Sequence, residues 1–116
     1  MRENAYFEDL RHKEKDSVEQ YLFHHYADSL DFGSSVFQLS KLPFFCHIER
    51  IVKILREAGI YSIVLTEGNE HTFTVLNEFA RLGCTGFEPT TISRFTTWDP
   101  SEQNERTHHD GIRIIL

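Results

Sequence analysis

The sequence predicts an α/β (α+β) domain with a mixed sheet of about four strands, in the order helix–β–α–β–α–β–β. Apolar residues recur at helical spacing in three segments, and two of these alternate with strand-like runs. This alternation favours a sheet whose first strands are parallel. Because 116 residues is close to the commonest domain size, we expect one domain. It comprises an N-terminal helical segment over 1–30 and a β-α-β-α-β-β core over 31–116.

The firmest part of the N-terminal segment is "SVEQYLFHHYADSL", residues 17–30. Ser17 is positioned to cap this helix, and Gln20 follows at capping-box spacing. One face of the helix collects apolar and aromatic residues, namely Val18, Tyr21, Leu22, His25 and Tyr26. The charged residues 11–16 form either the surface of a longer helix or a hinge.

The first strand–helix unit follows a break at Gly33. Residues 35–40, "SVFQLS", read as a strand. Pro43 ends this strand, and a helix spans about residues 44–58. Its apolar stripe is Ile48, Ile51, Val52 and Leu55, and Gly59 is a natural C-terminal cap.

The second unit begins with "IYSIVLT", residues 60–66, an apolar run typical of a strand covered on both faces. The turn "EGNE" uses Gly68 for an unusual backbone angle and Asn69 as helix cap. A phosphate-binding loop needs more glycines or a lysine, and Glu67 and Glu70 would repel phosphate. The helix over 69–82 is predicted to face inward with Phe73, Leu76, Phe79 and Ala80, flanked by Val75 and Leu82, and to end at Gly83.

The C-terminal part is predicted as two strands separated by a polar loop. Residues 87–98, "FEPTTISRFTTW", form a long strand interrupted early by Pro89. Residues 99–111 contain no hydrophobic residue and read as the loop. The segment 112–116, "IRIIL", closes the chain as a strand that returns antiparallel.

The composition of the chain restricts the classes of partner and the cellular location that we expect. The formal net charge of −6 is the opposite of a nucleic-acid footprint, so nucleic acid is not an expected partner and a basic protein is favoured. No apolar run of about 18 residues exists, so we expect no membrane span. The N-terminus lacks a secretory signal, and Cys46 and Cys84 read as free thiols, which places the protein in the cytoplasm.

Ordinary catalytic and metal motifs are missing. His24 and His25 are adjacent on a helix and point about 100° apart. His108, His109 and Asp110 have ligating chemistry but no metal-site spacing around them. His47 does not face Cys46, and a helix C-terminus before Cys84 raises rather than lowers a thiol pKa. We therefore expect no catalytic residue, metal or cofactor.

From Val36 to Leu116 the layout resembles the C-terminal half of the GNAT acetyltransferase fold. The segments "VFQLSKLP", "IERIVKILREAG", "IYSIVLT", "NEHTFTVLNEFARLG", "GFEP" and "IRIIL" follow in the family's order. Asn69 resembles the asparagine that approaches the cofactor in that family. The resemblance implies an acyl-CoA-dependent N-acyltransferase with Asn69 at the cofactor.

Two departures from that family bear on activity. Its glycine-containing pyrophosphate loop corresponds to "KLPFFCHIER", which has no glycine. Its tyrosine acid corresponds to Phe79 or Leu82, and neither can donate a proton. Ornithine decarboxylase antizyme is similar in this respect, as a fold of this type that acts as a protein inhibitor.

The leading hypothesis is a small acidic non-enzymatic protein that binds and regulates or inhibits a partner macromolecule. The alternatives are the GNAT-like acyltransferase with an atypical cofactor loop and a structural subunit of a larger assembly. The partner and the oligomeric state are left open. Exposed aromatics rimmed by acids are typical interface anchors, and the predicted surface comprises Phe44, Phe45, Glu67, Glu70, Trp98, Asp99, Glu102, Glu105 and Asp110.

Overall fold

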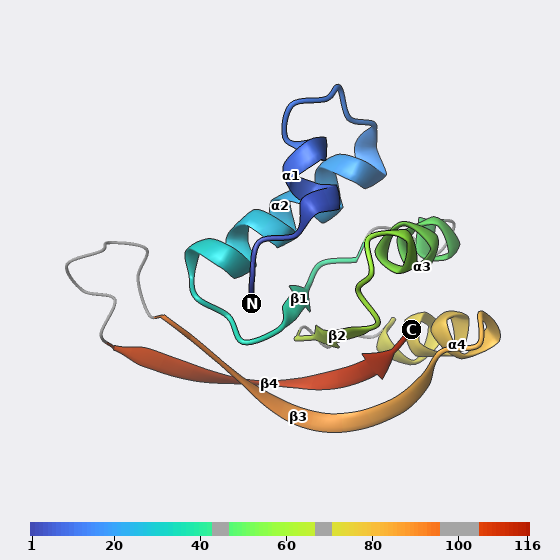
Figure 1. The fold of residues 1–116 in the computed structure, drawn as a ribbon. Coiled ribbons are helices and arrows are strands. Elements are labelled where there is room, and N and C mark those ends of the chain that lie inside the picture. Colours follow the sequence, from blue (N-terminus) through green and yellow to red (C-terminus); the bar gives the residue numbers. More distant parts are fainter. Residues whose placement is uncertain (43–46, 67–70, 96–104) are drawn as a thin grey trace.

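The computed structural model describes residues 1–42, 47–66, 71–95 and 105–116. Helices and strands follow the predicted order (Figure 1). Two helices, α1 and α2, stand where one N-terminal helix was predicted, and residues 11–16 connect them. The elements are α1 (Ala5–Leu10), α2 (Ser17–Asp31), β1 (Phe37–Leu39), α3 (Ile48–Glu57), β2 (Ser62–Leu65), α4 (Thr72–Arg81), β3 (Thr85–Phe95) and β4 (Arg106–Ile115).

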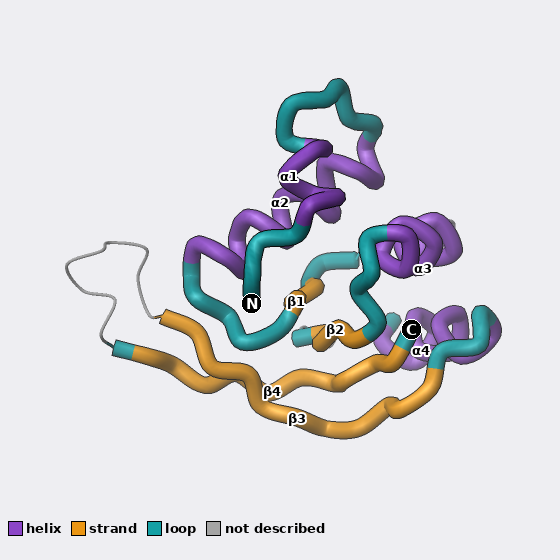
Figure 2. Tube along the Cα trace, viewed as in Figure 1, coloured by secondary structure: helices purple, strands orange, loops and turns teal. Residues whose placement is uncertain are grey.

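The strands form one mixed sheet in the order β1-β2-β4-β3 (Figure 2). β1 and β2 are parallel, with Phe37 opposite Ile63. β4 runs antiparallel to both of its neighbours, β2 and β3. The predicted parallel first pair and the antiparallel return of the chain are therefore confirmed.

The main core joins one face of the sheet to all four helices. Residues paired across neighbouring strands share a face, so Phe37, Ile63 and Ile114 point the same way. All three are buried, as is the whole predicted stripe of α3. The cluster also takes Phe7 and Leu10 from α1, Val18, Leu22 and Tyr26 from α2, Leu39 and Leu65 from the sheet, and Val75 and Phe79 from α4.

The second face of the central strand is buried as well. Val64 is only 2% exposed, although it points away from its neighbours Ile63 and Leu65. The β3–β4 hairpin extends beyond β2 (Figure 1), and its Ile92, which the strand pairing puts on the same face as Val64, is also buried. Arg94 on this hairpin donates from Nη1 to Gln38 Oε1 of β1 at 3.0 Å. Coverage of β2 on both faces, as its apolar sequence predicted, is thus confirmed.

The cap of α2 differs from the prediction by one residue. Asp16, not Ser17, is the N-cap: its Oδ1 accepts the Glu19 N–H at 2.9 Å, and Glu19 Oε1 accepts the Asp16 N–H at 3.2 Å. Asp16 also forms an ion pair with Arg50 of α3. A carboxylate at this position serves the helix end and a tertiary contact together, which the Ser17 hydroxyl one residue later cannot do.

This cap gives stability a pH dependence. The Arg50 guanidinium, helped by the Glu19 N–H, lowers the pKa of Asp16 from 3.8 to about 2. A carboxyl whose pKa is depressed by folding stabilises the fold above its unfolded pKa, and this contribution disappears as pH falls toward about 2. We expect Asp16→Asn to destabilise the protein near neutral pH, and the difference from wild type to shrink below about pH 4. Denaturant unfolding at several pH values measures both.

Ser17→Ala is the matched control for that experiment. Because Ser17 is an exposed first-turn residue rather than the cap, the substitution should leave stability nearly unchanged across the same pH range. A larger loss for Ser17→Ala than for Asp16→Asn at neutral pH would contradict the assignment of the cap.

The prediction for the inner face of α4 was partly wrong. Phe79 is fully buried and Leu76 is partly buried, as predicted, but Phe73 is 82% exposed and Ala80 is exposed. Val75, predicted as a flanking residue, joins the core instead. α4 packs on α3, and four-residue spacing puts Val75 and Phe79 together on that side. Phe73 stands roughly opposite them on the helix.

The last strand is longer than predicted. The predicted loop over 99–111 was wrong for residues 106–111, which are strand and pair with residues 90–95 of β3. These side chains carry no strand-like apolar pattern, but the β3 ladder satisfies their backbone groups. Pro89 lies inside β3, where it is tolerated because β3 is an edge strand. The predicted helix stops are confirmed, since Gly59 and Gly83 take φ values of +78° and +86°.

Candidate functional site

Most residues of the predicted partner surface lie outside the described residues. These are Phe44, Phe45, Glu67, Glu70, Trp98, Asp99 and Glu102, together with Asn69 and Cys46. Glu105 and Asp110 are described, and both are exposed. The Asp110 carboxylate accepts a hydrogen bond from Thr91 Oγ1, on the facing strand, at 3.3 Å.

The histidines near Asp110 are spread over two faces of β4. His108 and Asp110 share one face because they are two residues apart, and His109 points to the other. His109 Nε2 lies 2.9 Å from Thr107 Oγ1. Within the described ranges, no group of three or more His, Cys, Asp or Glu side chains is arranged to hold a metal ion.

Three large hydrophobic side chains of the described residues stand out at the surface. Phe73 of α4 is 82% exposed, Tyr61 before β2 is 59% exposed, and Phe87 of β3 is 36% exposed. The value for Phe73 is the decisive one, because a helical side chain of this size commonly buries much of its area. Sequence analysis missed this residue as a surface feature because it assigned Phe73 to the core.

The outer edge of β3 is protected against pairing with another strand. The Phe95 N–H donates to Phe32 O at 2.6 Å and therefore points to the outer edge, away from β4. Every second residue of a strand directs its backbone groups to the same side, so the outer edge also carries those of Ser93, Thr91 and Pro89. Pro89 has no N–H, and the Ser93 carbonyl accepts from Arg106 Nη2 at 3.0 Å. Proline and side-chain caps of this kind prevent edge-to-edge association. A partner would therefore meet side chains here rather than extend the sheet.

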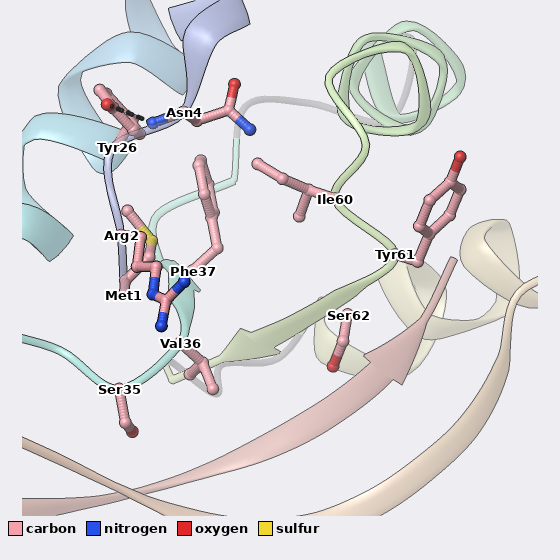
Figure 3. Close-up of a pocket in the computed structure, with 10 residues that line it drawn as sticks. All are labelled: Met1, Arg2, Asn4, Tyr26, Ser35, Val36, Phe37, Ile60, Tyr61 and Ser62. Carbon is pink, nitrogen blue, oxygen red and sulfur yellow. Dashed lines mark hydrogen bonds between the residues drawn. The ribbon is translucent and has the colours of Figure 1, made fainter.

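A pocket of about 310 Å³ opens between the N-terminal residues, β1 and the approach to β2. Figure 3 shows Phe37 and Ile60 pointing toward one another across it. Sequence analysis missed the pocket because its walls come from segments that are distant in the chain. Its lining residues are Met1, Arg2, Asn4, Tyr26, Ser35, Val36, Phe37, Ile60, Tyr61 and Ser62.

The polar groups at the inner end of the pocket are engaged in the fold. Tyr26 Oη donates to Glu8 Oε2 at 2.6 Å and accepts the Asn4 N–H at 2.9 Å. Asn4 Nδ2 donates to Ala58 O at 2.9 Å, and Asn4 Oδ1 accepts the Phe7 N–H at 3.2 Å. Burial, followed by the hydrogen bond to Glu8, raises the pKa of Tyr26 to about 12. This phenol therefore stays protonated near neutral pH and joins α1 to α2.

Two other titratable side chains are buried or partly buried. The Cys84 thiol is free and only 3% exposed, and burial raises its pKa against the opposing effect of Arg56. A protonated, buried thiol is a poor nucleophile. Burial also lowers the pKa of His25, whose ring lies 4.3 Å from that of Tyr21. Its Nδ1 is 2.9 Å from Tyr21 O, which places it as a structural histidine.

The chain is an α+β protein in which a four-stranded mixed sheet packs against helices. Residues 21–116 match the model of a family described as Domain of unknown function (DUF7698), and the chain belongs to that family. The match contains the whole sheet with α3 and α4, but it begins after α1. Comparisons with curated proteins and with solved structures found no match. Over the described residues, no helix combines the length and apolar character needed to cross a membrane.

Proposed function

We propose that the protein is a non-enzymatic binding protein that regulates or inhibits a partner protein, and that Phe73 anchors the interface. The observation that carries the proposal is the 82% exposure of this phenylalanine beside a helix face that buries Val75 and Phe79. Fully burying such a side chain against a partner is worth about 1.5–3 kcal/mol. Because single exposed hydrophobics are common, the proposal rests on the extent of exposure.

Charge supports a basic partner. The chain carries 18 acidic and 12 basic side chains, and Glu67 and Glu70 precede Phe73 closely in the sequence. Acids around an aromatic anchor accelerate association with a positively charged surface and exclude acidic competitors. The protected outer edge of β3 argues against sheet extension at that edge, and contact through side chains is the mode of binding that we propose.

The test is affinity purification from cells that express the protein, with Phe73→Ser compared with wild type. Thr74→Ser is the matched control, because Thr74 is the neighbouring exposed residue of α4. We expect wild type and Thr74→Ser to retain the same protein and Phe73→Ser to lose it. Retention by all three would contradict the proposal.

The double substitution Glu67→Lys and Glu70→Lys tests whether these two acids contribute to binding of that partner, once it is identified. We expect affinity to fall at least about tenfold, which corresponds to 1.4 kcal/mol, and the fall to be smaller at high salt. Unchanged affinity would remove these acids from the interface.

Sedimentation of the isolated chain tests the alternative that the protein is a structural subunit of a larger assembly. If the chain self-associates and Phe73→Ser abolishes the self-association, the Phe73 surface binds a second copy of the chain.

A further inference from the structure

We propose that the pocket beside the N-terminal residues binds a carboxylate attached to a small branched or aromatic apolar body. Its volume of about 310 Å³ is at the lower end of the range for small-ligand sites. It shares no lining residue with α4, so it is independent of the proposed protein interface.

The side chains that form the pocket walls favour a ligand with an apolar body. Val36 and Phe37, where β1 begins, and Ile60, before β2, contribute aliphatic and aromatic surface (Figure 3). Tyr26 adds its ring, while its hydroxyl is occupied by Glu8 and Asn4. A ligand that places only carbon against these four side chains leaves no buried polar group unpaired.

The charged side chain among the lining residues is a cation, which favours an anion, and the neighbouring Glu8 carboxylate is engaged by Tyr26 Oη and Arg11. None of the ten lining residues is acidic, although the chain has 18 acidic and 12 basic side chains. Arg2 contributes the charged side chain, and no ion pair joins it to an acid of the described residues. Figure 3 shows it among the side chains that line the pocket. A guanidinium pairs bidentately with a carboxylate.

A carboxylate suits this pocket better than a phosphate. The Met1 ammonium, which also lines the pocket, donates to Ser34 O at 2.7 Å. Removing a doubly charged phosphate from water against apolar walls costs more than removing a singly charged carboxylate. The carboxylate can belong to a free organic acid or to the last residue of a peptide. Both sources offer the same chemistry, and the experiment separates them.

The experiment is NMR titration of the full chain with 3-phenylpropionate and 4-methylpentanoate, against 3-phenylpropionamide and inorganic phosphate. We expect shifts at Val36, Phe37 and Ile60 with the acids, and affinity at least about tenfold weaker for the amide and for phosphate. Arg2→Gln should weaken acid binding to the level of the amide. Lys53→Gln, an equal loss of charge on the exposed side of α3, should leave it unchanged.

The peptide Gly-Gly-Phe, with a free or an amidated C-terminus, identifies the source of the carboxylate. Tighter binding of the free-terminus peptide than of 3-phenylpropionate supports a peptide end, and the reverse supports a free acid. Equal binding of acid and amide would overturn the proposal. So would acid shifts confined to other residues, or no shift with either acid up to about 10 mM, ten times a 1 mM dissociation constant.

Discussion

Replacing Phe79 with alanine is expected to lower the free energy of unfolding by about 3–5 kcal/mol, whereas Phe73→Ala should change it by less than about 0.5 kcal/mol. The two phenylalanines lie on the same helix, α4, and undergo the same chemical change. Phe79 is 0% exposed inside the main core, and Phe73 is 82% exposed. Removing the buried ring loses its transfer free energy and leaves a cavity, while the exposed ring makes little contact to lose.

Denaturant unfolding of the two variants measures this difference directly. Comparable losses would mean that Phe73 is packed in the folded protein, which would also remove the observation behind the proposed interface. For partner binding we expect the opposite order of effects. Phe79→Ala should still bind the partner under conditions in which the variant is folded, whereas Phe73→Ser should lose binding. Stability and binding would then be assigned to opposite sides of one helix.

Gly111→Ala is expected to destabilise the protein by about 1–3 kcal/mol, the usual cost of overpacking a core. A Cβ built at Gly111 would lie 2.5 Å from Val64 Cγ1 and 2.9 Å from Leu65 O. The carbonyl belongs to the β2 backbone, and Val64 is 2% exposed, so neither neighbour can move without disturbing the sheet. Alanine normally improves on glycine in a strand by about 0.5–1 kcal/mol, and the clash reverses this sign.

A double-mutant cycle with Val64→Ala isolates the contact. Val64→Ala removes Cγ1, so Gly111→Ala should cost less in that background than in wild type. The close contact between the new Cβ and Leu65 O remains in that background, so part of the loss in free energy of unfolding should persist. If Gly111→Ala raised the free energy of unfolding of the wild type, the close approach of β4 to β2 would be wrong.

Several elements could be predicted because their signals are local. The stripe of α3 is regular enough to define one buried face, and Gly59 and Gly83 mark the helix ends by adopting positive φ. The continuous apolar run of β2 predicted burial on both sides, and Val64 confirms it. In each case the evidence lies within a window of about 10 residues, in which helical or strand periodicity is sufficient.

Other features could not be read locally. The sequence around α4 offers apolar residues on more than one side, and its packing on α3 selects Val75 and Phe79 rather than Phe73. Residues 106–111 are polar, and they become a strand because β3 supplies hydrogen-bond partners. The Asp16 cap, in contrast, has a local signal in Glu19 at capping-box spacing, and only its ion pair with Arg50 depends on the tertiary structure.

The candidate sites divide in the same way. The acidic charge and the absence of ordinary catalytic motifs are properties of the chain and require no coordinates. The exposure of Phe73 and the pocket beside Arg2 depend on how segments far apart in sequence pack together. Periodicity specifies which elements form, since it acts within one helix or strand. Which face of an element is buried, and which pocket remains, depends on close packing between elements, and no single segment of sequence contains that information.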